Sequence, residues 1–368
     1  MSEHILLTPG PTPLPPSVRA KMAEPILHHR TQEFAQVFQR VLAGMQQVFR
    51  TKSQTLMLTT SGTGAMESAV ANLLSPGDRA LVHSTGAFGN RFVKILKAYG
   101  IEPMVIFEEW GEAAQPQRLK ALLNASPGFK VVFFQHTDTS TGVLNDIETL
   151  SRTVRENSDA LVVVDTVSGL AAERFETDSW GVDVALTGSQ KGLMNAPGLA
   201  FAAVSEKAWT ACGTAKLPRF YLDWRTMRDS LPQKETPYTP AVSLVVAQAE
   251  ALRLILKEGL DNVVNRTREL ALYTRTEVTN RLGLRLFAKD PAHILTAAWL
   301  PEGADGDALL KNLLTEERIS IANGQEKLKG KIIRIAHMGY ISKSDVQAGL
   351  SALERRLKTL IGAVRSRS

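Results

Sequence analysis

One lysine in this sequence stands on a turn between two apolar runs. Lys191 lies within 186–198 (LTGSQKGLMNAPG), after the run 182–186 and before the run 199–204. Asp165 ends an earlier apolar run, and the carboxyl ends of strands are where open α/β sheets bind ligands. Pyridoxal 5′-phosphate (PLP) requires this pair, an amine for a Schiff base and a carboxylate for the pyridine nitrogen. A surface lysine and a helix-capping aspartate remain the alternative for the two residues taken alone.

A stretch of small residues, 61–64 (SGTG), separates an expected strand at 56–60 from an expected helix at 65–74. Free backbone N–H groups and the dipole at a helix start favour phosphate. The stretch is neither a dinucleotide fingerprint nor a P-loop, because the third glycine and the Gly-Lys-Ser/Thr ending are missing. It predicts a phosphate site, with a tight turn that binds nothing as the alternative.

Two further side chains have types that suit ligand binding. Phe88 stands between small residues on an expected loop, where an exposed ring can stack on a flat heteroaromatic ligand. Arg334 lies in an apolar strand, 331–336, and a buried arginine is costly without an anion. An internal salt bridge and a ligand carboxylate are both open as the source of that anion.

His28, His29 and Arg30 precede an expected helix at 31–49. Neighbouring histidines rarely point to one metal ion, and no third ligand is spaced to help. A polar entrance, or an anion contact made by Arg30, is favoured over a metal site.

Composition sets limits on the class of protein. The chain has 368 residues, a formal net charge of +6 and a single cysteine, so it can form no intrachain disulfide or multi-cysteine metal site. No apolar run approaches the length of a membrane span. Basic residues are spread along the chain rather than gathered in a nucleic-acid footprint. We expect a cytoplasmic protein that binds small molecules and neither nucleic acid nor membrane.

Strands and helices are expected to alternate through the first two thirds of the chain. Strands are expected at 56–60, 80–83, 105–107, 130–135, 161–164, 182–186 and 199–204, and helices at 31–49, 65–74, 91–99, 118–124 and 147–156. This order predicts an α/β fold whose mostly parallel sheet has helices on both faces.

The rest of the chain is expected to leave that sheet. The polar segment 221–239 looks like a long surface excursion, and two periodic helices, 243–257 and 261–282, follow it. Strands at 294–300, 319–322 and 331–336 and helices at 307–316 and 344–360 then predict a small α+β domain. The expected division is an N-terminal arm at 1–20, a large domain at 21–255 and a small C-terminal domain at 256–368.

Six motifs stand in one order along the chain: LLTPGPTPLPP, SGTGAMES, TSTG, VVVDTVSG, GSQKG and IIRIAHMG. The set closely resembles the class V PLP-dependent aminotransferases, specifically the alanine–glyoxylate/serine–pyruvate branch and its soluble-hydrogenase small-subunit relatives. The resemblance covers residues 6–339. It implies the PLP-dependent transferase fold type I and PLP as the cofactor.

The resemblance also implies roles for four residues at the reacting centre. Lys191 would hold the cofactor as a Schiff base and move the proton, and Asp165 would keep the pyridine nitrogen protonated. Arg334 would bind the substrate α-carboxylate, while the arm at Gly10 closes over it.

Further cofactor contacts are implied in the same way. Phe88 and Val167 would pack on the two faces of the ring. Thr236 and Thr239 would come from the other subunit of a homodimer; Thr239 is the more secure, since close relatives have a larger hydroxyl residue at 236. The remaining contacts would be Gly62, Thr63 and Gln190 at the phosphate, and Thr139 at the polar edge of the ring with His136 behind it.

The activity implied is transfer of an amino group from alanine or serine to glyoxylate or pyruvate. Arg30 leaves a 2-aminoethylphosphonate or aspartate transaminase as the alternative. A cysteine desulfurase or lyase is less favoured, because the sole Cys212 lies far along the chain from Arg334. A non-catalytic hydrogenase-accessory protein would not need Lys191, Asp165 and Arg334 together.

Overall fold

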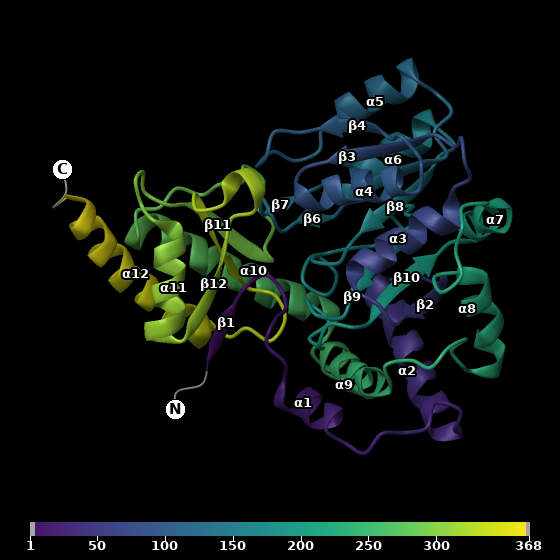
Figure 1. The fold of residues 1–368 in the computed structure, drawn as a ribbon, viewed down its shortest axis with the longest axis horizontal. Helices are drawn as coiled ribbons and strands as arrows, with labels where there is room; N and C mark the ends of the chain where they lie inside the picture. Colours follow the sequence, from purple (N-terminus) through teal and green to yellow (C-terminus); the bar gives the residue numbers. More distant parts are fainter. Residues whose placement is uncertain (1–3, 366–368) are drawn as a thin grey trace.

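A computed structural model describes residues 4–365, with side chains to residue 359. Figure 1 shows two lobes, a larger one built from the first two thirds of the chain and a smaller one built from the last third. Helix α10 (Leu260–Thr276) continues the chain from α9 (Val242–Glu258) of the larger lobe into the smaller one. The domain boundary expected between residues 255 and 256 falls in the last turn of α9 and stays a prediction.

The larger lobe is built on a seven-stranded sheet of order β2-β10-β9-β8-β5-β3-β4. All neighbouring pairs from β9 to β4 are parallel, whereas β10 is antiparallel to both β9 and β2. The expected mostly parallel sheet is therefore confirmed. Its strands are β2 (Gln54–Leu58), β3 (Ala80–Ser84), β4 (Met104–Phe107), β5 (Val131–Gln135), β8 (Leu161–Asp165), β9 (Val184–Gly188) and β10 (Ala200–Val204).

Helices cover both faces of this sheet. Successive residues of one strand enter different cores, as Val132 and Val162 pack on one face and Val131 and Val163 on the other. Buried residues on both faces explain why these strands read as continuous apolar runs. One face is covered by α2 (Gln32–Phe49), α5 (Pro116–Ala125), α6 (Ile147–Asn157) and α9; the other by α3 (Gly62–Leu73), α4 (Ala87–Ala98), α7 (Glu206–Thr214) and α8 (Trp224–Ser230).

The smaller lobe contains a four-stranded sheet of order β1-β12-β13-β11. Its edge strand β1 (Ile5–Leu7) comes from the start of the chain and pairs in parallel with β12. The chain then passes through an irregular stretch to α1 (Pro16–Met22), which packs on α9 of the larger lobe. The other elements are β11 (Leu295–Trp299), β12 (Ile319–Asn323), β13 (Ile332–Ala336), α11 (Gly306–Glu317) and α12 (Lys343–Arg365), while β6 (Thr137–Asp138) and β7 (Val143–Leu144) form a small hairpin between the lobes.

Three local expectations were wrong. Helix α4 begins at Ala87, so Phe88 lies in its first turn and not on a loop, and α3 begins at Gly62 rather than at residue 65. The segment 221–239 is not simply a surface excursion, because it contains α8. Trp224 is the first residue of that helix and is fully buried, and its ring nitrogen donates to Ser68 Oγ at 3.0 Å.

No helix in the described part of the chain is long and apolar enough to cross a membrane.

Replacing Trp224 with alanine should lower the free energy of unfolding by about 3–5 kcal/mol, because a large buried ring is removed and Ser68 loses its donor. Urea unfolding followed by circular dichroism measures the change. Phe107→Ala, at a ring that is 57% exposed on β4, is the matched control and should cost under about 1 kcal/mol. Equal losses in the two variants would contradict the buried position of Trp224.

Candidate active site

Lys191 is held on the loop that joins β9 to the antiparallel β10. The loop closes on itself, since Asn195 N donates to the Ser189 carbonyl at 3.0 Å and Ser189 Oγ donates to the Ala196 carbonyl at 2.6 Å. Lys191 is only 8% exposed. The sequence-based placement of this lysine between two strands is confirmed.

Asp165 lies at the carboxyl end of β8, beside the strand that leads to Lys191. In the parallel register Asp165 is paired with Leu186 of β9, which brings both strand ends to one edge of the sheet. Asp165 Oδ1 accepts a hydrogen bond from Val167 N at 2.8 Å. Val167 in turn lies against the start of α3, where a Cβ added to Gly62 would come within 2.7 Å of its side chain.

Burial shifts the pKa of both groups toward their neutral forms. It raises the pKa of Asp165 to about 6, with the nearby Asp138 carboxylate adding to the shift. It lowers the pKa of Lys191 to about 8, against the opposing attraction of Asp165. At neutral pH the carboxylate is therefore ionised, while a useful fraction of the amine is neutral and can act as a nucleophile or base.

The start of α3 forms an anion seat. Its N-cap, Ser61, makes no side-chain cap, so this helix end is not closed by the chain itself. Gln190 lies close by, because a Cβ added to Gly188 would meet both Gln190 Oε1 and the backbone N of Gly62. Gln190 Oε1 is buried without a hydrogen-bond partner. The expected phosphate residues Gly62, Thr63 and Gln190 thus come together.

Phe88 is positioned by a carboxylate whose role the sequence did not indicate. Asp138 Oδ2 accepts from Phe88 N at 3.0 Å and from Gly89 N at 3.4 Å, and its Oδ1 accepts from Ser140 N and Oγ. It thereby ties the hydroxyl-rich loop 136–142 to the first turn of α4. Burial raises the pKa of Asp138. The only sequence signal was an acid within a run of hydroxyl residues.

The N-terminal arm lies directly on the lysine. Lys191 Nζ donates to the Pro9 carbonyl, and Thr12 Oγ1 donates to the Lys191 carbonyl at 3.0 Å. A Cβ on Gly10 would fall 2.3 Å from Lys191 Cε, and the φ of Gly10 is +126°. Only glycine fits at this point of the arm.

Arg334 is a buried cation that the smaller lobe contributes from β13. It is 5% exposed, and it donates to the Thr139 carbonyl at 2.6 Å and to the Asn323 carbonyl at 2.7 Å. Among the side chains described, no carboxylate lies within ion-pair distance of it. Burial lowers the pKa of Arg334 to about 10, and its charge lowers the pKa of Lys191. The internal salt bridge considered from the sequence does not form among the described side chains.

Arg91 is a second cation at the site, and the sequence did not single it out. Its Nη1 donates to Thr63 Oγ1 at 2.9 Å, and its guanidinium carbon lies 4.5 Å from the centre of the Phe88 ring. Its charge lowers the pKa of both Asp165 and Lys191. A spacing of three residues from Phe88 on α4 was the signal available.

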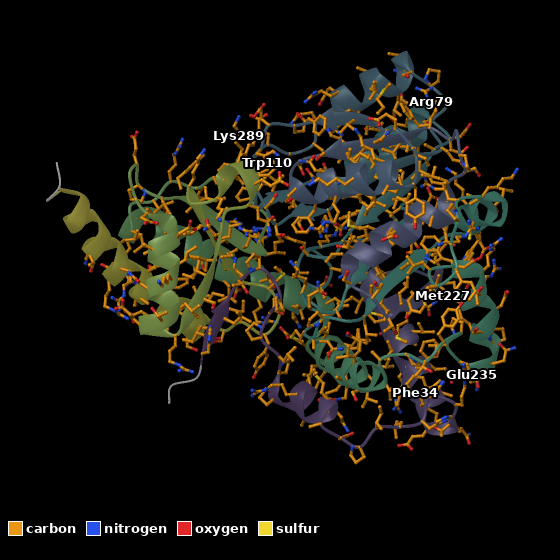
Figure 2. All side chains as sticks on the ribbon, in the orientation of Figure 1. Phe34, Arg79, Trp110, Met227, Glu235 and Lys289 are labelled. Carbon is orange, nitrogen blue, oxygen red and sulfur yellow. The ribbon has the colours of Figure 1, made fainter. Side chains whose placement is uncertain are left out.

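The segment around 235–239 contacts the residues before α2 and makes no contact with Lys191 in the described chain. Arg30 donates to Glu235 at 2.5 Å and to the Thr236 carbonyl at 2.8 Å, and Thr239 Oγ1 lies 3.5 Å from His29 Nε2. Figure 2 shows Glu235 at the lower right edge, on the opposite side from Trp110 and Lys289 at the junction of the lobes. Within the described chain no contact joins Thr236 or Thr239 to Lys191.

The histidines singled out from the sequence occupy two different settings. His28 and His29 have ring centres 4.9 Å apart, and no group of three potential metal ligands occurs among the described residues. His136 is buried beside Phe175 and Trp180, and burial lowers its pKa to about 4. It is a neutral residue at the start of the loop 136–142, with its ring packed against Phe175 and Trp180.

The chain is similar along nearly its whole length to proteins of one family. Residues 5–348 match the family model for aminotransferase class-V. The chain belongs to this family. It is 40% identical to the soluble hydrogenase small subunit of a Synechococcus species over 97% of this chain and 93% of that protein, and 34% identical to the L-aspartate–glyoxylate aminotransferase of Paracoccus denitrificans over 96% and 91%. It is also similar to the crystal structure of the alanine–glyoxylate aminotransferase of a Nostoc species, with a TM-score of 0.92, 32% identity and coverage of 97% and 96%.

This class V aminotransferase is a transaminase whose cofactor is PLP, and its fold is that of the PLP-dependent aminotransferases. The site fits the cofactor, because an amine, a carboxylate, an open helix start and the unpartnered Gln190 Oε1 surround one region. When bound, PLP supplies an electron-withdrawing ring on which an amino group can be exchanged for a carbonyl oxygen.

The sole cysteine is remote from these groups. Cys212 is fully buried in α7, and its Sγ lies 3.7 Å from Asn72 Oδ1. Burial raises the pKa of the Cys212 thiol. A buried thiol with a raised pKa does not provide the exposed thiolate that a desulfurase needs.

Capture of PLP by the cofactor-free protein should rise with pH to a plateau with a midpoint near 8, because only the neutral Lys191 amine reacts. Borohydride quenching and peptide mapping measure the fraction fixed on Lys191. Asp165→Asn should move the midpoint lower, since the carboxylate raises the pKa of the lysine. The internal control is Lys94, an exposed lysine that should capture less PLP than Lys191 at pH 8. Equal labelling of the two lysines at that pH would contradict the burial argument.

Proposed function

We propose that this transaminase moves an amino group from a small amino acid, alanine or serine, to a small 2-oxo acid, glyoxylate or pyruvate. The observation that carries the proposal is Arg334, a buried guanidinium that has carbonyl but no carboxylate partners among the described residues. A buried cation is stabilised by an anion, and an α-carboxylate matches a guanidinium in charge and geometry.

The other residues then have defined tasks. Lys191 carries the cofactor and moves the proton at the substrate α-carbon, and Asp165 holds a proton at the pyridine nitrogen. Phe88 and Val167 enclose the ring between them. Gly10, pressed against Lys191 by the arm, excludes water from the reacting atoms. Each task matches the burial and the hydrogen bonds of the residue concerned.

Small substrates are favoured by the crowding of the site and by the fate of Arg30. The arm contacts Lys191 at Pro9 and Gly10, which leaves little room above the amine. Arg30 is occupied by Glu235, so it is a poor candidate for the second cation of a dicarboxylate or phosphonate site. Aspartate remains the second candidate donor, because Arg91 does lie at the site and one relative is named for aspartate.

Arg334→Ala should lower kcat/KM by about 100- to 1,000-fold with every amino donor and 2-oxo acid, because a desolvated charge-assisted contact is lost from all of them. A panel of alanine, serine and aspartate against glyoxylate and pyruvate measures this. Arg285→Ala, at an arginine stacked on Trp299, is the control and should leave every rate unchanged.

The panel also ranks the donors. We expect alanine or serine to exceed aspartate in kcat/KM in the unmodified enzyme. Aspartate as the fastest donor would overturn the small-substrate assignment while leaving transaminase activity intact.

We also propose a homodimer in which the segment 236–239 completes the partner's cofactor site. Phe220 is 78% exposed and Tyr221 44% exposed, and both rings pack on Tyr238 of that segment. An exposed aromatic cluster of this kind suits an interface. Just after this segment, Ala241 N donates to Thr59 Oγ1 at 3.4 Å, three residues before Gly62.

Phe220→Asp should convert the dimer to monomers and weaken PLP retention, because a charge is placed within the aromatic cluster. Analytical ultracentrifugation gives the assembly state, and dialysis against buffer gives the loss of cofactor absorbance. Phe107→Asp, at an exposed ring on β4, is the control and should change neither. A monomeric unmodified enzyme that keeps its cofactor would refute the shared site.

A further inference from the structure

The cofactor's phosphate is left without a cation by the residues that the sequence indicates. At neutral pH a phosphate monoester carries a charge between −1.5 and −2. The expected contacts, Gly62, Thr63, Gln190, Thr236 and Thr239, are all neutral. The start of α3 supplies only about half a positive charge. A buried dianion therefore calls for a positive side chain that the motifs did not identify.

Arg91 lies where such a charge is needed. Its Nη1 is 2.9 Å from Thr63 Oγ1, and Thr63 is the second residue of α3, whose free N–H groups form the anion seat. The charge of Arg91 also lowers the pKa of both Asp165 and Lys191. Helices α3 and α4 pack against each other, so the relation between Arg91 and the seat is built into the fold.

Arg91 is also available to bind an anion. Among the side chains described, no carboxylate lies within ion-pair distance of it; its contacts are a hydroxyl and an aromatic ring. The other two cations at the site have different partners, since Lys191 donates to the arm and Arg334 donates to one carbonyl from each lobe, Thr139 and Asn323. A half-buried arginine with only neutral contacts can pair with a phosphate at little cost.

We infer that Arg91 binds the cofactor phosphate, from α4, alongside the backbone N–H groups of α3. Its place over the Phe88 ring then couples the two halves of the cofactor seat, because Phe88 stacks on the ring while Arg91, one helical turn on, holds the phosphate. The inference rests on PLP as the cofactor of the family and is independent of which amino donor is used.

The test compares PLP with pyridoxal, which has the same ring and aldehyde but no phosphate. Cofactor-free Arg91→Gln is titrated with each compound, and binding is followed by quenching of tryptophan fluorescence. The dissociation constant for PLP should rise by about 10- to 100-fold, since a charge-assisted contact is lost, while that for pyridoxal stays within about twofold. Arg91→Lys should recover part of the affinity for PLP, because it keeps the charge but not the fork.

Lys97→Gln is the matched control, because Lys97 is an exposed cation on the same helix. It should bind both compounds as the unmodified chain does. Equal weakening of PLP and pyridoxal in Arg91→Gln would mean that Arg91 supports the ring or the fold, and would overturn the inference. Unchanged PLP binding together with a selective loss of aspartate turnover would overturn it as well, and would assign Arg91 to a distal substrate carboxylate.

Discussion

Lys191 and Asp165 are both buried at one edge of the central sheet. Many of the contacts around them offset the free-energy cost of burying two charged groups. Two buried charges are expensive to remove from water, and the electrostatic attraction between Lys191 and Asp165 favours the charged form of each. The parallel register of β8 and β9 brings the strand ends that lead to these residues to one edge of the sheet.

The two lobes are joined through the same region. Arg334 of β13 reaches across to the Thr139 carbonyl, and Ala292 N donates to the Gly142 carbonyl at 2.8 Å. On the far side of that loop, His293 Nδ1 lies 2.9 Å from Glu173 Oε2. The loop 136–142 is therefore fixed from both lobes, and a movement of the smaller lobe would displace Arg334 and the loop together.

The start of the chain closes the arrangement. Strand β1 extends the sheet of the smaller lobe, α1 packs on the larger lobe, and the stretch between them lies on Lys191. Gly10 permits that contact, because any side chain there would meet the lysine. A segment near residue 10 thus becomes part of a site whose lysine is far away in sequence.

The amino-acid sequence by itself determined the alternation of strands and helices, the mostly parallel sheet, and the lysine and aspartate at its edge. These features rest on local patterns: strands buried on both faces are apolar throughout, and ligand groups follow them. Helix starts were placed less well, since α3 and α4 begin within runs of small residues and their N-cap residues, Ser61 and Gly86, make no side-chain cap. Trp224 was missed because its burial comes from packing against α3 and α7 rather than from its polar neighbours.

Only the tertiary structure decided which charges meet. Arg30 pairs with Glu235, and Arg334 has carbonyl partners but no carboxylate partner among the described side chains. Asp138 and Arg91 carried no motif of their own, and they join the site because α4 docks between α3 and the loop 136–142. Residue types and spacing specify what a side chain can do. Which residue that side chain contacts depends on distances between segments that are remote in sequence. Those distances are set by how the sheet and the two lobes pack.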